Sequence, residues 1–418
     1  MEQKFYLCID LKSFYASVEC IERGLDPFSV NLVVADPSRG PGAITLAASP
    51  AIKQLGVPSR GRIFEIDKTI SYIIAKPRMK LYMQYAAKVY AIFLRFIASE
   101  DIHVYSIDES FLDITSYLCL YQMNPKQLAK TIIQTIYNEL GICATVGIGT
   151  NLFLSKIALD ITAKHAKDCM GYLDENLFYQ QIWHHRPITD IWMIGPGSAR
   201  RLASLGIYDL YGVAHYPQKK LYQLFGINAE YIIDHAWGKE PTTIADIKAY
   251  QPSSNSISNS QILFEDYLYQ DAFLVMKEMV ETNVLKLTEK HLVTDHISLY
   301  IRYSKDIHKP SRGSRKITNR TNSYQILLQE FKLLFKKIVD PNYPIRQIAI
   351  SFGNIKDEAY EQFDLFTDFK DIEKEKQIQR TLVSIQQKYG KNAILKGMNL
   401  CDKATQRNRN RLIGGHNA

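Results

Sequence analysis

The chain has 418 residues, is 46% hydrophobic and carries 51 Lys+Arg against 43 Asp+Glu, which gives a formal net charge of +8. This length predicts about two to four domains with buried cores, and the basic excess suits a polyanionic partner without proving one. The six cysteines form no C-x-x-C pair, the start is too charged for a signal peptide, and no apolar run is long enough to cross a bilayer. The sequence therefore argues against a zinc site and a membrane partner, and favours a cytoplasmic protein.

The first 170 residues alternate irregularly between strand-like and helix-like segments. Short apolar, β-prone runs predict the strands, and longer amphipathic runs predict the helices. In chain order we expect strands at 5–10, 31–35 and 145–149, a turn at 36–42, a hairpin at 104–114, and helices at 13–22, 82–97, 125–140 and 152–164. This alternation predicts an α+β or split βαβ sheet.

After about residue 170 the pattern changes. Residues 171–240 predict short helices, and 241–255 are rich in Ser, Asn, Thr and Pro, which predicts a linker. A second pattern of sheet and helices follows, with helices expected at 271–287 and 324–339, strands at 296–303 and 346–352, and a polar end with a helix at 372–389.

Three acids carry the strongest chemical signal. Asp10 ends a predicted buried strand, and Asp108 and Glu109 form the turn of the predicted hairpin. Carboxylates that converge at strand ends repel one another, and hard divalent cations relieve that repulsion. Two such ions can activate an attacking hydroxyl and stabilise a leaving pyrophosphate. The alternative for either segment alone is that Asp10 caps a helix and that Asp108 and Glu109 form a polar turn.

Residues 10–19, 105–113 and 147–158 resemble, in order and spacing, three motifs of the Y-family DNA polymerases. The resemblance extends over the whole chain and is closest to the UmuC-like proteins of Gram-positive bacteria. It implies an α+β right-hand fold with a ferredoxin-like palm, small fingers, a helical thumb with a helix-hairpin-helix, and a little finger of sheet plus helices. The implied enzyme is a DNA-directed DNA polymerase, a nucleotidyltransferase that copies damaged templates with low fidelity.

The resemblance also implies the domain bounds and the location. The palm would comprise 1–21 and 81–170, the fingers 22–80, the thumb 171–240, the linker 241–255, the little finger 256–355 and the tail 356–418. Fingers this small would cover the nascent base pair loosely, which is a physical basis for low fidelity. The protein would be cytoplasmic and associated with the nucleoid.

At the active site, the resemblance implies two Mg²⁺ ions, with Mn²⁺ as a substitute. Asp10 and Asp108 would bridge the ions, Glu109 would bind the catalytic one, and the Leu11 carbonyl would complete a shell. The nucleotide would meet Ser13, Phe14, Tyr15, Lys53 and Lys156, with Tyr15 under the sugar. Without the motifs, Phe14 and Tyr15 would be an ordinary aromatic core pair, and Lys156 a solvent-facing helix lysine. Lys53 and Pro50 depart from the arginine and tyrosine of many relatives, and Lys12 replaces a further acid found in some.

Three further segments resemble contact surfaces for primer-template DNA, which together with deoxynucleoside triphosphates would be the substrate. Gly195 and Gly197 resemble a phosphate-binding helix-hairpin-helix, or alternatively a capped helix-turn. A basic stretch expected to link two strands would grip DNA through Arg302, Arg312, Arg315 and Lys316, or else be a solvated loop. The sequence Gln362-Phe363-Asp364-Leu365-Phe366 resembles a motif for a sliding clamp, or else a hydrophobic staple. Some relatives also need accessory subunits.

Two other functions remain open. A sheet with paired acids also suits a nucleotide cyclase, although a cyclase would leave the basic stretch and the clamp-like motif unexplained. A non-catalytic scaffold that binds the clamp and regulates polymerase exchange is the other alternative, and the presence of all three acids argues against it.

Overall fold

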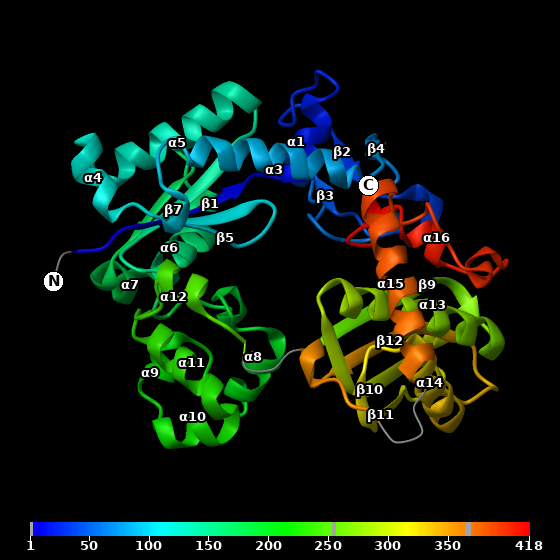
Figure 1. Ribbon diagram of the computed structural model, residues 1–418. Coiled ribbons are helices and arrows are strands. Elements are labelled where there is room, and N and C mark those ends of the chain that lie inside the picture. Colours follow the sequence, from blue (N-terminus) through cyan, green and yellow to red (C-terminus); the bar gives the residue numbers. More distant parts are fainter. Residues whose placement is uncertain (1–2, 253–255, 364–368) are drawn as a thin grey trace. The chain divides into compact units, whose positions relative to one another are not determined.

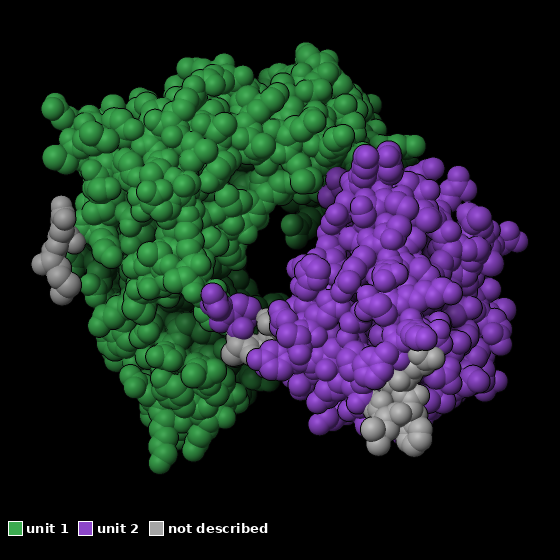
Figure 2. Space-filling view, in the orientation of Figure 1, with its two compact units in different colours: residues 1–250, 418 green, residues 251–417 purple. Residues whose placement is uncertain are grey.

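The computed structural model describes residues 3–252, 256–363 and 369–418. The chain divides into two compact units, one of residues 1–250 with residue 418 and the other of residues 251–417 (Figure 2). Among the described residues, none of the helices combines the length and the apolar character needed to cross a membrane.

A five-stranded sheet forms the centre of the first unit (Figure 1). Its order is β5-β6-β1-β7-β8, with β7 and β8 parallel and the other neighbours antiparallel. Side chains of a strand point alternately to the two faces, and β1 is buried along almost its whole length, so both faces are covered. Helices α3 and α5 lie on one face and α6 on the other (Figure 1). The bounds are β1 Tyr6–Leu11, β5 Ile102–Val104, β6 Glu109–Asp113, β7 Ala144–Gly149, β8 Met170–Leu173, α3 Met79–Phe93, α5 Pro125–Leu140 and α6 Leu152–Ile157.

Helix α6 packs unusually close to the sheet. A Cβ on Gly147 would lie 2.1 Å from the Ser155 carbonyl oxygen, and one on Gly149 would lie 2.2 Å from the Ser155 nitrogen. The expected helix over 152–164 is wrong in its second half, since α6 ends at Ile157 and a π-helical turn, Ala158–Thr162, follows. Gly171 of β8 allows this turn to approach, because a Cβ there would lie 2.1 Å from Thr162 Oγ1.

A smaller sheet in the order β3-β2-β4 and a set of short helices complete the first unit. The helices after residue 173 surround their own apolar core. The segment expected as a linker contains helix α12, so that expectation is wrong for part of it; Thr243 caps the helix by accepting from the Asp246 amide. The remaining bounds are α1 Phe14–Ile21, β2 Leu32–Val34, β3 Ala47–Ala48, α2 Pro50–Gln54, β4 Ile73–Ala75, α4 Thr115–Tyr121, α7 Glu175–Gln181, α8 Pro196–Ala203, α9 Leu210–Ala214, α10 Gln218–Phe225, α11 Ala229–Ala236 and α12 Ile244–Ala249.

The second unit is built on a four-stranded antiparallel sheet in the order β11-β10-β12-β9. Helices α13 and α14 bury one face of it, which forms the core of this unit. The basic stretch expected to link two strands is largely the edge strand β11, and β9 was not anticipated. The bounds are β9 Ile257–Tyr267, α13 Tyr269–Glu289, β10 Leu292–Tyr303, β11 Ser311–Thr321, α14 Tyr324–Ile338, β12 Ile345–Gly353 and β13 Lys356–Asp357.

The end of the chain packs within the second unit. Helix α15 (Phe369–Tyr389) lies along α13, and the segment after it docks on Glu278, a fully buried residue of α13. The Glu278 carboxylate accepts from Asn399 Nδ2 at 2.9 Å and from the Thr405 amide at 2.8 Å. These bonds explain how a polar segment orders itself on a helix surface. Helix α16 (Gln406–Arg409) and the short strands β14 (Leu412–Ile413) and β15 (His416–Asn417) follow.

Candidate active site

The register of the central sheet brings the three predicted acids to one end of two adjacent strands. Asp10 on β1 lies opposite Glu109 on β6, and the Leu11 amide donates to the Asp108 carbonyl at 2.9 Å. Directly opposed residues of neighbouring strands project to the same face, so Asp10 and Glu109 share the face covered by α6. Asp108 lies in the turn between β5 and β6, outside the regular strand. Adjacent residues on a regular strand face opposite sides of the sheet. Because Asp108 lies in the turn, it can share a site with Glu109.

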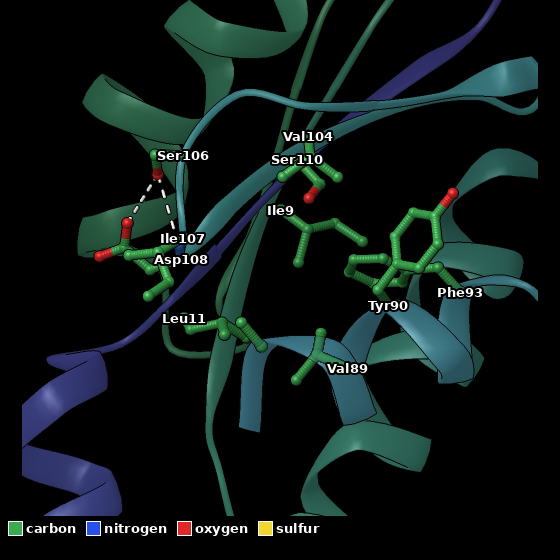
Figure 3. A pocket seen from close by; sticks show the side chains of 11 residues that line it. Ile9, Leu11, Val89, Tyr90, Phe93, Val104, Ser106, Ile107, Asp108 and Ser110 are labelled. Atoms are coloured by element: carbon green, nitrogen blue, oxygen red, sulfur yellow. Dashed lines mark hydrogen bonds between the residues drawn. The ribbon is translucent and has the colours of Figure 1, made fainter. Parts of the chain in front are cut away.

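Asp108 is oriented by its own turn. The Ser106 hydroxyl donates to Asp108 Oδ1 at 2.7 Å, and the Asp108 amide donates back to Ser106 Oγ at 3.3 Å (Figure 3). Behind this turn lies a small, mainly apolar pocket lined by Ile9, Leu11 and side chains of α3 (Figure 3). Asp108 is one of the polar residues that line this pocket.

Asp10 is the acid whose ionisation is most affected. Burial is the largest cause that raises the pKa of Asp10, the carboxylates of Asp108 and Glu109 add to it, and Lys164 and Lys156 oppose it, so that the pKa of Asp10 is about 7. Mutual repulsion of this kind requires the three carboxylates to be close in space. The site therefore concentrates negative charge in a place where a cation would be stabilised.

Lys156 provides a cation in that place. Its Nζ lies 2.7 Å from Glu109 Oε1 and 3.0 Å from Asp160 Oδ2, and both Lys156 and Glu109 are buried. Burial alone would lower the pKa of Lys156, but Cys8, Glu109 and Asp160 together raise it above its ordinary value. The Cys8 thiol also donates to Glu109 Oε1 at 3.2 Å. In this state Lys156 compensates an acid, whereas its predicted contact is with a triphosphate.

The donor set fits hard divalent cations. Asp10, Asp108 and Glu109 with the Leu11 carbonyl supply oxygen alone, which is the ligand type that Mg²⁺ and Mn²⁺ prefer. In residues 3–252, 256–363 and 369–418, no group of three or more His, Cys, Asp or Glu side chains is already drawn together as a metal cage. The acids are thus assembled at one edge, with Glu109 Oε1 paired to Lys156.

The predicted nucleotide subsite lies beside these acids. Ser13 precedes α1 in a left-handed backbone conformation, with φ of 52°, and its hydroxyl accepts from Lys53 Nζ at 2.7 Å. Burial lowers the pKa of Lys53, the nearby Lys12 and Lys164 lower it further, and Asp10 opposes them. Lysines from three separate segments therefore surround Asp10. Phe14 is buried and Tyr15 half-buried, with ring centroids 5.7 Å apart.

Sequence reasoning missed Lys164 and discounted Lys12. Lys164 follows the π-helical turn and pairs with Asp160 at 2.7 Å, and it acts on Asp10 more strongly than Lys156 does. A regular helix over 152–164 would not direct the side chain of residue 164 toward the acids. The sequence therefore gave no reason to include Lys164 in the site. Arg60 is a further cation that was missed, and it acts on the Tyr15 hydroxyl.

The predicted DNA contacts fall into two groups. Arg302, Arg312 and Lys316 alternate along β10 and β11 with residues that face the helices, so they lie on the open face of the sheet. Arg315 projects to the opposite face, where it pairs with Glu330 of α14 at 2.6 Å. The first three are therefore better placed to meet a phosphate backbone than Arg315.

The two glycines of the predicted helix-hairpin-helix lie at the start of α8. Gly195 precedes the helix and Gly197 is in its first turn, and a Cβ on either would meet nothing within 4 Å. The preceding Trp192 donates from Nε1 to the Tyr105 hydroxyl at 3.1 Å, which connects this segment to the turn that carries Asp108. Both glycines are exposed, and the space that a side chain would occupy at either is open.

The clamp-like motif is described in part. The Gln362 backbone amide donates to the Arg320 carbonyl at 3.0 Å, and the side-chain oxygen Oε1 of Gln362 accepts from the Arg320 backbone amide at 3.4 Å. Gln362 therefore extends the edge of β11. Phe363 is 38% exposed and contacts the ring of Phe369. Asp364, Leu365 and Phe366 lie outside the described residues.

Comparison with known proteins gives a consistent result. The model of the impB/mucB/samB family matches residues 9–160, and the model of the C-terminal domain of that family matches residues 254–365. UvrX of Bacillus subtilis (strain 168), which carries the name of a UV-damage repair protein, is 32% identical over 99% of this chain and 98% of its own length. DNA polymerase IV 2 of the same organism is 28% identical over 100% of this chain and 99% of its own length.

A solved structure shows the same fold. The Y-family DNA polymerase chimera Dbh-Dpo4(243-245)-Dbh aligns with a TM-score of 0.63 at 21% identity, over 84% of this chain and 99% of its own. The right-hand fold expected from the motifs is thereby confirmed. With both family models matched and a relative above 30% identity along the full length, the chain belongs to the impB/mucB/samB family, the Y-family of DNA polymerases.

Proposed function

We propose that this DNA-directed DNA polymerase extends primers across damaged template bases with low fidelity, by nucleotidyl transfer assisted by two divalent cations. The observation that carries the proposal is the register of β1 and β6, which sets Asp10 opposite Glu109 with Asp108 in the adjoining turn. The fold gains nothing from ionised acids in this arrangement, because burial and mutual repulsion disfavour their charged forms and raise the pKa of Asp10 to about 7. A site that maintains such repulsion is a candidate for function.

Each acid has a separate task in this proposal. Asp10, Asp108 and the Leu11 carbonyl would hold two Mg²⁺ ions, or Mn²⁺ in their place, and Glu109 would hold the catalytic one. Bound there, the ions would supply charge stabilisation for attack of the primer 3′-hydroxyl on the α-phosphate and for departure of pyrophosphate. Ser106 keeps Asp108 in its orientation through the 2.7 Å bond to Oδ1.

The lysines would bind the triphosphate. Lys53 is already held by the Ser13 hydroxyl, and Lys164 and Lys12 act on the same small volume around Asp10. Lys156 would reach phosphate oxygens after Glu109 exchanges it for a cation. Because these groups are point charges, they neutralise phosphate oxygens without the fixed bidentate geometry of an arginine.

Contacts with the template are proposed on the open face of the second unit. Arg302, Arg312 and Lys316 would meet backbone phosphates there, and Gly195 and Gly197 would offer amides to another phosphate. Such contacts ignore base sequence, so affinity would fall as salt rises, with a slope set by the number of phosphates neutralised.

Partner binding is proposed at Gln362-Phe363-Asp364-Leu365-Phe366. Phe363 is 38% exposed on a segment otherwise rich in charge, and an exposed ring of this kind is stabilised when a partner buries it. The partner is a sliding clamp, which would keep the polymerase at the primer end, and accessory subunits would act in addition as they do in some relatives.

Primer extension tests the site directly. We expect Asp108→Ala and Glu109→Ala to abolish extension of a primer-template in Mg²⁺ or Mn²⁺, while binding of the same DNA, followed by fluorescence anisotropy, stays unchanged. The control is Asp113→Asn on the same strand, because the Asp113 carboxylate accepts from the Thr115 amide at 3.0 Å and lies at the other end of β6. This control should extend primers normally.

Two outcomes would contradict the proposal. If either alanine variant still extended the primer, the assignment of the substituted acid to the metal site would be wrong. If the unmodified protein extended no primer even with a clamp present, the chain would act as a clamp-bound scaffold instead. Extension past a defined lesion, compared with extension on an undamaged template, separates lesion bypass from ordinary synthesis.

A further inference from the structure

Tyr15 rests on a second tyrosine. Its ring lies parallel to that of Tyr82, with centroids 4.4 Å apart and an interplanar angle of 16°. Tyr82 belongs to α3 and is fully buried, whereas Tyr15 on α1 is half-buried. One face of the Tyr15 ring is therefore backed by a side chain that cannot move into solvent.

Tyr82 is itself fixed from behind. Its hydroxyl donates to Glu19 Oε1 at 2.7 Å, and Glu19 has no exposed surface. Arg78 binds both oxygens of the same carboxylate, from Nε at 2.9 Å and Nη2 at 2.8 Å, and Arg23 pairs with it from the side. A paired carboxylate that accepts this many bonds holds its partners in one geometry.

The protonation of Glu19 agrees with this arrangement. Burial alone would raise its pKa, but the hydrogen bonds from Arg78, Arg23 and Tyr82 lower it below the ordinary value of a glutamate. The carboxylate is thus ionised at neutral pH and remains an acceptor for Tyr82. Burial and the bond to Glu19 both raise the pKa of the Tyr82 hydroxyl, so it remains a donor.

We propose that Tyr82, held by Glu19 and Arg78, is a positioning residue that sets how strictly this polymerase rejects ribonucleotides. The inference rests on the proposed role of Tyr15 under the sugar. A ring rejects a 2′-hydroxyl only while it cannot retreat, and the parallel stack blocks retreat toward α3. Sugar selection thereby depends on Tyr82 and Glu19, two buried residues of α3 and α1 that lie behind the Tyr15 ring.

The size of the effect follows from the stack. An aromatic pair contributes about 0.5–1.5 kcal/mol beyond the area it buries. Loss of that constraint would lower the ratio of kcat/KM for a deoxynucleotide over the matching ribonucleotide by about three- to tenfold. The gain should come mainly from the ribonucleotide, since the deoxynucleotide does not press on the ring.

The experiment compares four variants of the full chain on one undamaged primer-template. Tyr82→Leu removes the stacked ring and should lower the selectivity ratio by about three- to tenfold. Tyr82→Phe retains the ring and removes the bond to Glu19, so it should lower the ratio by a smaller factor. Tyr15→Ala measures the gate itself and should lower the ratio most.

The fourth variant, Tyr85→Leu, is the matched control. Tyr85 lies on the same helix, is also buried and donates to an α1 glutamate, Glu22, at 2.8 Å, but within the described residues its ring makes no aromatic contact with Tyr15. It should lose stability as Tyr82→Leu does and keep the selectivity ratio.

The outcomes separate the inference from the function on which it depends. If Tyr15→Ala leaves the ratio unchanged, the role of Tyr15 is wrong. If Tyr15→Ala lowers the ratio but Tyr82→Leu does not, or if Tyr85→Leu lowers it equally, the inference about Tyr82 is overturned. Should Tyr82→Leu fail to fold, Tyr82→Phe decides alone, and an unchanged ratio in that variant overturns the inference.

Discussion

The buried ion pair between Lys156 and Glu109 allows a sharp test of how the site is held together. In Lys156→Met the side chain stays unbranched and is shorter by one heavy atom, while its charge is lost. Lys156 and Glu109 have side chains 9% and 10% exposed, with Nζ and Oε1 only 2.7 Å apart. Without the lysine, the buried Glu109 side chain would lose its ion-pair partner.

The magnitude follows from which acids lose their partner. Removing one member of a buried ion pair costs about 3–5 kcal/mol. Asp160 keeps Lys164 at 2.7 Å, so Glu109 alone is left uncompensated and the lower end, about 3 kcal/mol, applies. For a unit of this size each kcal/mol shifts the melting temperature by about 2–4 °C, so we expect a loss of about 6–12 °C.

Calorimetric unfolding of the metal-free full chain measures this loss. Lys164→Met is the matched control, because its side chain is 45% exposed and its pair with Asp160 should contribute less than about 1 kcal/mol. Saturating Mg²⁺ should narrow the gap between Lys156→Met and the unmodified protein, since a cation held by Glu109 replaces the missing charge. A loss below about 1 kcal/mol in Lys156→Met would refute the buried pair as the source of stability.

Three further predictions concern packing and hydrogen bonds. Gly147→Ala should cost about 3 kcal/mol or more in urea unfolding, because its Cβ would lie 2.1 Å from a backbone oxygen of α6; Gly42→Ala, with nothing within 4 Å, should stay within about 0.5 kcal/mol. Glu19→Gln should cost about 1–3 kcal/mol at neutral pH. Because its folded pKa is lowered, the stability that Glu19 contributes is present above about pH 4.3 and is lost on acidification through the folded value, so the variant should show a flatter acid limb in unfolding curves. Trp192→Phe and Tyr105→Phe should each cost about 1 kcal/mol, and the double variant no more than either, if the 3.1 Å bond is the shared loss.

Much of the fold follows from local pattern. The helix at 125–140 agrees with α5 to the residue, because Asn124, Pro125 and Gly141 mark both ends in the sequence. The edge strand β9 was missed, since its exposed Ser and Asn residues resemble a linker until the sheet is formed. Strand β11 was taken as a loop for the same reason, because an edge strand tolerates a basic, polar sequence.

The site was harder to derive than the fold. The sequence placed Asp10 and the Asp108–Glu109 pair at the ends of predicted strands, and the register of β1 and β6 sets Asp10 opposite Glu109. Lys164 depends on a π-helical turn, and no residue pattern over 152–164 distinguishes that turn from a regular helix. Gly171 leaves room for this turn to pack against β8, a strand that the sequence did not predict.

The strands of the central sheet position the acids of the site, and the helical segments supply its lysines. The backbone register of two adjacent strands holds the acids in place, although their side chains carry charge of the same sign. The lysines come from elsewhere: Lys53 from α2, Lys156 from α6 and Lys164 from beyond it. A cation that replaced Lys156 at Glu109 would therefore leave the strands in place and displace side chains only. In the proposed function, that separation would let ions and triphosphate enter and leave at every cycle while the acids keep their spacing.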